Sequence, residues 1–239
     1  MKQDCKVIIA LDVAEQDYAL NIVDKLISCI DIFKVGLELF TVAGPAILDE
    51  IHRRGKKIFL DLKFHDIPTT VSRAGVAAAR KGVFMFNVHA SGGTDMMKKC
   101  RDDVVNVCLK ENLHRPRMIA VTVLTSMSPE VLKAELGLQH SLATHVRHLS
   151  GMALKAGLDG VVASGHEAAM IKGHCGDKFL VVTPGIRPSW AAADDQARIM
   201  TPKKAIGAGA DYLVMGRSVL NQPDPIKAIE RIQQEISGS

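Results

Sequence analysis

Three charged residues crowd the end of one apolar run in this sequence. In "FLDLKFHDIPTTV", which begins at Phe59, Asp61 and Lys63 stand two residues apart, and Asp66 follows just before a proline. Lysine and carboxylate side chains are groups that proteins use for proton transfer and for electrostatic stabilisation. Crowded together, they are costly to desolvate unless opposite charges alternate and serve a charged ligand. The spacing therefore predicts a functional site for a charged ligand.

Eight short β-rich runs, each followed by a segment with helical spacing of apolar residues, must position these groups. The runs begin at Val7, Ile32, Ile58, Phe84, Met118, Gly160, Phe179 and Tyr212. Alternation of strand and helix predicts a parallel sheet, and eight repeats predict a closed (β/α)8 TIM barrel of the α/β class. An open doubly wound sheet is the alternative. We expect one domain over residues 1–239, because no linker or composition break divides the chain.

The barrel makes a prediction about position, because the active sites of TIM barrels lie at the carboxyl ends of the strands. Polar residues recur at or just after these ends: Asp12, Lys34, Asp61, Lys63, Asn87, His89, Thr125, Arg187 and Arg217. Charges that are merely solvated would be expected on the helices instead. We therefore expect a single ring of polar groups around one mouth.

Asp61 and Lys63 are predicted to face that mouth, since residues two apart on a strand share a face and the adjacent leucines suit the helix side. A structural ion pair is the alternative interpretation of these two residues. Asp66 lies beyond the reach of the strand, where it could instead cap the next helix. Lys34, which arrives at the same mouth from the neighbouring run, favours a functional cluster.

The loops after the last two strands are expected to bind phosphate, as they do in many barrels. Gly216 would admit close backbone approach, and Arg217 would pair with the dianion. Arg187 could be a second residue that binds the phosphate. The segment that follows it is interpreted as a lid that carries Gln196. A surface ion pair is the alternative for either arginine.

No metal site or cofactor motif is predicted. His145 and His148 have helical spacing but lack an evident third ligand, and His65 and His89 lie near lysines that would repel a cation. The glycines at 207 and 209 follow a helical segment and precede a strand, which is the reverse of the dinucleotide-binding order. Binding of Mg²⁺ by carboxylates is the alternative to a site without metal.

Composition narrows the possible partners. The net charge is +4, but basic and acidic residues interleave, which argues against a nucleic-acid surface and is compatible with a small anionic ligand. Charges precede the first apolar run, so we expect neither a signal peptide nor a membrane span. Five cysteines without a C-x-x-C pair predict reduced thiols in a cytoplasmic protein.

The stretch "DLKFHDIPTT" from Asp61 resembles the signature of the orotidine 5′-phosphate decarboxylase family. The resemblance covers essentially the whole chain, with blocks in the family's order: "ALD", "KVGLELF", "NVHASGG", "AVTVLTSM", "GLDGVVAS", "VTPGIRP" and "GADYLVMGRSV". One departure is Thr69, where bacterial members often carry Asn. The resemblance implies a single-domain bacterial-type enzyme that converts orotidine 5′-monophosphate to uridine 5′-monophosphate and CO₂, the last step of de novo pyrimidine biosynthesis, without a cofactor.

Roles for individual residues also follow from the resemblance. Asp12 and Lys34 would bind the ribose hydroxyls and steady the charge network. Asp61 would face the substrate carboxylate, and Lys63 would protonate the C6 carbon as CO₂ departs.

The resemblance further implies a homodimer with shared active sites, in which Asp66, Ile67 and Thr70 reach into the partner's site. Ser126 or Ser128 could contact the pyrimidine ring. The remaining implied contacts are to the nucleotide and its phosphate: Thr125, Arg187, Gln196, Gly216 and Arg217.

Two rival functions remain. The first is an enzyme with a different chemistry, and the second is a binding protein without catalytic activity. A Mg²⁺-dependent sugar-phosphate decarboxylase or synthase of the same superfamily would share Asp61, Lys63 and Asp66, but not the "FHDIP" filling or the "LTSM" block. A catalytically silent nucleotide-binding barrel is disfavoured because both lysines and all three aspartates are present.

Overall fold

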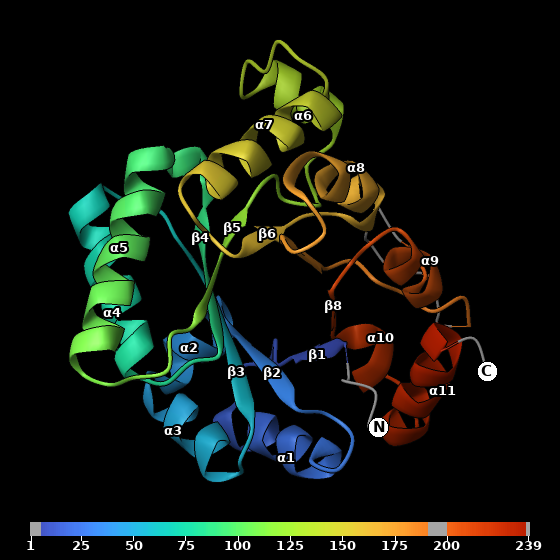
Figure 1. Ribbon diagram of the computed structural model, residues 1–239. Helices are drawn as coiled ribbons and strands as arrows, with labels where there is room; N and C mark the ends of the chain where they lie inside the picture. The colour runs from blue at the N-terminus through green and yellow to red at the C-terminus, as the bar shows by residue number, and fades with distance from the viewer. Residues whose placement is uncertain (1–5, 191–199, 238–239) are drawn as a thin grey trace.

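A computed structural model describes residues 6–190 and 200–237, and its strands close into a parallel barrel (Figure 1). Each strand pairs with the next in chain order, and β8 pairs with β1. The prediction of a TIM barrel is confirmed, and the open doubly wound alternative is wrong. The strands are β1 (Val7–Ala10), β2 (Ile32–Gly36), β3 (Lys57–Phe64), β4 (Met85–His89), β5 (Arg117–Val121), β6 (Gly160–Val162), β7 (Leu180–Thr183) and β8 (Tyr212–Met215).

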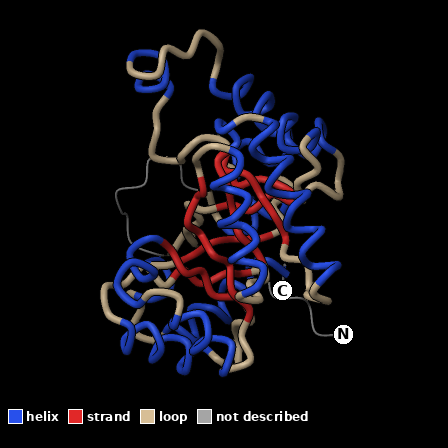
Figure 2. The backbone as a smooth tube through the Cα atoms, turned by 90° about the vertical axis from the view of Figure 1, so that its left-hand side faces the viewer, coloured by secondary structure: helices blue, strands red, loops and turns tan. Residues whose placement is uncertain are grey.

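Helices enclose the barrel on its outside, as the tube view makes plain (Figure 2). They are α1 (Gln16–Leu26), α2 (Leu37–Ala43), α3 (Ala46–Arg53), α4 (Pro68–Arg80), α5 (Thr94–Lys110), α6 (Pro129–Ala134), α7 (Leu142–Lys155), α8 (Gly165–Cys175), α9 (Pro202–Gly207), α10 (Arg217–Leu220) and α11 (Pro225–Ser237), with a 3-10 turn at Ala90–Gly92. Two helices rather than one follow β2, because Gly44 at φ 61° and Pro45 interrupt the helical backbone there. Gly207 is the last residue of α9 and Gly209, at φ 102°, follows it, so the two glycines lie at the end of a helix and not in a dinucleotide-binding turn.

Two apolar layers hold the fold together. The barrel interior is filled by one small cluster: Ile8, Ala10, Ile32, Phe59, Met85, Ile119, Val182 and Val214. A larger cluster packs the outer faces of the strands against the helices, with Phe33 and Phe86 fully buried in it. Each large apolar side chain buried in this way contributes about 1.5–3 kcal/mol. Because both faces of every strand are covered, the strands read as nearly continuous apolar runs and not as alternating ones.

A bulge interrupts the pairing of β3 with β4 beside the predicted site. Leu60 pairs with Phe86 and Phe64 pairs with Val88, so β3 uses four residue steps where β4 uses two. The extra residues include Lys63, whose φ of 51° lies in the left-handed region. β3 is thus regular as far as Leu60 and irregular where its charged residues begin.

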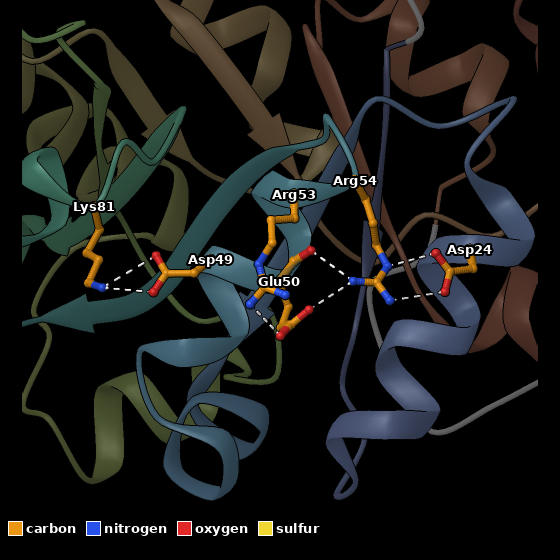
Figure 3. A network of polar contacts seen from close by, with 6 residues as sticks. All are labelled: Asp24, Asp49, Glu50, Arg53, Arg54 and Lys81. Atoms are coloured by element: carbon orange, nitrogen blue, oxygen red, sulfur yellow. Dashed lines mark hydrogen bonds and ion pairs between the residues drawn. The ribbon is translucent and has the colours of Figure 1, made fainter.

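Ion pairs tie α3 to its neighbours on the outer surface (Figure 3). Arg54 donates to Asp24 of α1 with Nε at 2.7 Å and also pairs with Glu50 at 3.1 Å. Asp49 pairs with Lys81, just beyond α4, at 3.1 Å. These exposed pairs contribute little stability individually, about 0–1 kcal/mol each. Among the residues that the structure describes, no helix combines the length and the apolar character needed to cross a membrane.

Gly160 gives a test of the packing between neighbouring strands. A Cβ atom at this position would lie 2.5 Å from Leu180 Cβ and closer still to the Leu180 carbonyl oxygen. We expect Gly160→Ala to lower the free energy of unfolding by about 1–3 kcal/mol, because backbone must move to admit the methyl group. Urea denaturation followed by circular dichroism measures this.

Gly173→Ala is the matched control, because Gly173 lies in α8 and no atom lies within 4 Å of the place that an added methyl group would take. There the same substitution should stabilise the helix by about 0.5–1 kcal/mol. Equal unfolding midpoints for the two variants would contradict the described register of β6 and β7.

Candidate active site

A cavity of about 700 Å³ opens at the carboxyl ends of the strands. Its lining combines apolar side chains of the barrel interior, such as Phe59 and Val214, with polar residues from the strand ends. The residues predicted at the mouth that line this cavity are Asp12, Lys34, Asp61, Lys63, Thr125, Gly216 and Arg217. The fold therefore brings these residues from β1, β2, β3, β5 and β8 to one pocket.

The floor of the cavity carries a line of alternating charges. Lys34 Nζ lies 2.7 Å from Asp12 Oδ1 and 3.3 Å from Asp61 Oδ2. Lys63 Nζ lies 2.8 Å from the other oxygen of Asp61, Oδ1. Lys34 is 7% exposed and Asp61 is 9% exposed, so the central pair is removed from water. The order Asp12, Lys34, Asp61, Lys63 compensates each buried charge with one of opposite sign.

Burial and neighbouring charges act in opposition on the central pair. Burial lowers the pKa of Lys34, but the carboxylates of Asp61 and Asp12 outweigh it, and the pKa lies above its ordinary value. Burial raises the pKa of Asp61, but Lys34, Lys63 and hydrogen bonds from Lys63 and Asn87 bring it below its ordinary value. Both shifts favour the charged forms.

These shifts define the pH window of the network. The contribution of Asp61 to stability is present above the unfolded pKa of about 4 and is lost as the pH falls through its lowered pKa. The contribution of Lys34 is present below its unfolded pKa of about 10.4 and is lost as the pH rises through its raised pKa. Between these limits Lys34 and Asp61 stay charged.

Strand alternation alone does not explain why the Lys63 side chain points into the cavity. Leu60 and Leu62 do face the helix side, where they pack in the outer layer. Lys63, however, lies in the bulge with a left-handed backbone, and this conformation aims its ammonium back at Asp61. The shared orientation of Asp61 and Lys63 was predicted correctly, but for an incomplete reason.

Asn87 stands out in the sequence only as a polar strand end, yet it contacts both charged residues of β3. Its Nδ2 donates to Asp61 Oδ1 at 2.7 Å, and its Oδ1 accepts from the backbone N–H of Lys63 at 2.8 Å. Asn87 is 1% exposed and does not line the cavity. Tyr18, Glu38 and Asn221 do line it and were not predicted, because they lie on helices or after one and not at strand ends.

The segment after β3 turns away from the cavity of its own chain. Asp66, Ile67 and Thr70 are exposed and do not line the pocket, and Ile67 has 67% of its surface accessible. Asp66 Oδ1 accepts a hydrogen bond from the adjacent Ile67 N–H at 2.6 Å. Ile67, not Asp66, occupies the N-cap of α4, and no side chain caps that helix, so the capping interpretation of Asp66 is wrong.

Of the other residues predicted to contact the nucleotide or its phosphate, those that the structure describes do not line the cavity. Arg187 is 9% exposed and does not line the cavity, although Pro184 and Gly185 of the same segment do. Gln196 lies outside the described residues. Ser128 Oγ accepts from the Val131 N–H as the N-cap of α6, and Ser126 does not line the cavity.

The histidines considered as metal ligands fall into two pairs. His65 and His89 have ring centroids 5.4 Å apart beside the mouth, where burial, His65 and Lys63 all lower the pKa of His89. His145 and His148 line a shallow surface cavity on α7. Within residues 6–190 and 200–237, no group of three or more His, Cys, Asp or Glu side chains could hold a metal ion.

Comparison with known proteins gives consistent matches over nearly the whole chain. The family model described as "Orotidine 5′-phosphate decarboxylase / HUMPS family" matches residues 5–232. Orotidine 5′-phosphate decarboxylase of Saccharophagus degradans is 49% identical over 98% of this chain and 96% of its own length, and that of Geobacter metallireducens is 48% identical over 97% and 95%.

Solved structures agree with these matches. The crystal structure of orotidine 5′-phosphate decarboxylase from Lactobacillus acidophilus superposes with a TM-score of 0.85 at 38% identity, covering 98% of this chain and 99% of that one. An uncharacterized conserved protein from Geobacillus kaustophilus superposes with a TM-score of 0.84, also at 38% identity, over 96% and 99%. The chain belongs to the orotidine 5′-phosphate decarboxylase / HUMPS family.

Proposed function

We propose that this chain decarboxylates orotidine 5′-monophosphate to uridine 5′-monophosphate, the step that completes pyrimidine nucleotide synthesis. Relatives at 45–49% identity over nearly the full chain carry that activity in their names. The observation that carries the proposal is the line of alternating charges in which the buried Asp61 lies between Lys34 and Lys63. That arrangement suits the loss of a carboxylate from a carbon that then needs a proton.

The charges suggest how the reaction would be driven. A substrate carboxylate next to the ionised Asp61 would be repelled, and the repulsion would disappear as neutral CO₂ forms. Negative charge left on C6 would meet the ammonium of Lys63, which is already oriented and would then supply the proton. Lys34, fixed by Asp12 and Asp61, would hold the ribose and keep Asp61 ionised.

Binding of the phosphate is assigned to the opposite side of the cavity. Gly216 and Arg217, which follow β8, line the cavity on that side. The guanidinium would pair with the phosphate dianion, and this remote binding energy would help to order the reacting groups. Arg187 and Gln196 stay predictions as additional phosphate contacts, and Thr125 as a contact to the nucleotide.

The Mg²⁺-dependent alternative is disfavoured by the donors around Asp61. One carboxylate oxygen already accepts from Lys63 and Asn87, and the other faces Lys34. A bound Mg²⁺ would have to displace at least one of these donors, and the two ammonium groups would repel it. The proposed reaction therefore does not use Mg²⁺ bound at Asp61.

A homodimer with shared sites is part of the proposal. Asp66, Ile67 and Thr70 are exposed at the start of α4, outside the cavity of their own chain. In a two-fold dimer, whatever one chain donates it also receives, so Asp66 of each chain would complete the other's site. The cytoplasmic location likewise stays a prediction.

Lys63→Ala should abolish decarboxylation and leave the fold intact, since Lys63 lines the cavity and belongs to neither apolar cluster. A positioned general acid supplies about 10²- to 10⁴-fold in rate. We would follow the loss of orotidine 5′-monophosphate absorbance in a single turnover, with and without EDTA, and record circular dichroism alongside. The wild type should be active and unaffected by EDTA.

Lys57→Ala is the control, because Lys57 begins the same strand at the other end of the barrel. It should keep near wild-type activity. More than about a tenth of the wild-type rate in Lys63→Ala would exclude Lys63 as the proton donor, and loss of wild-type activity in EDTA would favour the Mg²⁺-dependent reaction.

Arg217→Ala should impair the phosphorylated substrate far more than the nucleoside that lacks phosphate. The fall in kcat/KM for the nucleotide should correspond to a loss of transition-state stabilisation on the order of several kcal/mol, as expected for a charge-assisted contact with a dianion. Arg147→Ala, at an exposed position on α7, is the matched control. Equal losses on both substrates would assign Arg217 to the support of the barrel.

Mixing two inactive variants tests the shared site. Lys63→Ala and Asp66→Ala homodimers should each be nearly inactive, but co-refolding them would form heterodimers with one whole site. With random pairing about half the dimers are mixed, so roughly a quarter of wild-type activity should return. Activity is measured after refolding the mixture and after refolding each variant alone. Heterodimers verified by tagged pull-down but without recovered activity would falsify the sharing of Asp66.

A further inference from the structure

Asn87 connects the two charged residues of β3 from inside the barrel. It lies on β4 and is 1% exposed, so its amide is removed from water. Its Nδ2 donates to Asp61 Oδ1 at 2.7 Å and its Oδ1 accepts from the Lys63 N–H at 2.8 Å. The orientation of the amide follows from chemistry, because a carboxylate only accepts hydrogen bonds and a backbone N–H only donates them.

The bulge in β3 explains why Lys63 needs this partner. Between Leu60 and Phe64, β3 leaves the regular ladder with β4, so the N–H of Lys63 has no carbonyl opposite it in register. A buried backbone N–H without a partner is costly. The side-chain carbonyl of Asn87 takes the place of the missing strand carbonyl.

The same contact holds an unfavourable backbone. Lys63 has φ 51°, a conformation that side chains of L-residues disfavour and that persists only where surrounding contacts impose it. This conformation turns the lysine side chain so that its Nζ lies 2.8 Å from Asp61 Oδ1. The direction of the ammonium thus depends on the backbone that Asn87 holds.

Asn87 also fixes the carboxylate of Asp61. Asp61 Oδ1 accepts from both Asn87 and Lys63, which leaves Oδ2 directed at Lys34 at 3.3 Å. Because the amide is neutral, it orients the carboxylate without changing the alternation of charges. An acidic residue in its place would put a second negative charge directly beside that of Asp61.

We propose that Asn87 is a positioning residue that aims the Lys63 ammonium and the Asp61 carboxylate at the reacting carbon. This inference rests on the proposed decarboxylation. Asn87 does not line the cavity, so it acts through the two residues and not on the substrate. Its loss should therefore lower kcat and leave KM nearly unchanged.

Asn87→Asp gives the decisive test, because it keeps the shape of the side chain. At neutral pH the new carboxylate can still accept from the Lys63 N–H, but it repels Asp61. When protonated, it can donate to Asp61 as the amide did. Its pKa should be raised by the adjacent carboxylate. We expect kcat to fall about 10²-fold at neutral pH, the order of loss for a misplacement of about 1 Å, and to recover as the pH is lowered.

The wild type should lack this acid-side recovery, and kcat and KM are measured for both proteins across the pH range. Asn87→Ala, which cannot make either bond at any pH, should lose kcat without recovery. Ser150→Ala is the control for a buried hydrogen bond away from the site, since Ser150 Oγ donates to the Val146 carbonyl within α7. It should leave kcat and its pH profile unchanged.

Each outcome decides a different point. An inactive wild type would contradict the proposed function itself. An active wild type together with an Asn87→Asp variant of unchanged kcat, or of low kcat without recovery in acid, would overturn the role of Asn87. Failure of Asn87→Asp to fold at any pH would assign Asn87 to stability alone, which also overturns it.

Discussion

Burial of the Asp61 carboxylate at the end of the barrel is the constraint on which the site depends. A charge this far from water is tolerated only where opposite charges and hydrogen-bond donors surround it. Lys34 from β2, Lys63 from β3 and Asn87 from β4 meet that requirement together. No single strand could supply all three, so the parallel register that brings three neighbouring strand ends to one level is a condition for keeping Asp61 ionised. The distortion of β3 belongs to the same arrangement, because the ammonium of Lys63 lies 2.8 Å from Asp61 Oδ1 on a left-handed backbone.

The predictions from sequence succeeded where one general rule was sufficient. Eight alternations of strand and helix predicted the closed barrel, and the rule that active sites lie at the carboxyl ends of strands predicted the shared pocket of Asp12, Lys34, Asp61 and Arg217. The rule was less informative where a strand is irregular. A bulge has no dependable sequence signal, so the left-handed backbone of Lys63 could not be foreseen, and neither could the part that Asn87 plays opposite it. Asn87 was visible as a polar strand end, but its two contacts depend on the register shift between β3 and β4.

Asp66 illustrates a different limit of prediction from sequence. Its distance from the strand predicted that it would not fold back beside Lys63 of its own chain, and it is exposed outside the cavity. The sequence also allowed it to be a helix cap, an alternative that only the geometry of Ile67 at the N-cap removes. The contact proposed for Asp66 would be made with a second molecule, and such a contact leaves no periodicity or spacing in one chain. The prediction that Asp66 acts in a partner's site therefore depends on the resemblance to a family more than on residue patterns.

Aspartate and lysine side chains of this kind can serve quite different chemistry, and the deciding factor is how the lone pairs of the carboxylate are used. A carboxylate with free oxygens can bind a metal ion, which then polarises the substrate. Here the oxygens of Asp61 already accept from two ammonium groups and one amide, so the protein supplies the counter-charges itself. Because these charges are fixed before the substrate arrives, little reorganisation is needed when negative charge develops on it. A permanent carboxylate next to Asp61 would share those two ammonium groups and make an ionised Asp61 more costly. The neutral amide of Asn87 is compatible with an ionised Asp61, because it donates a hydrogen bond without adding charge.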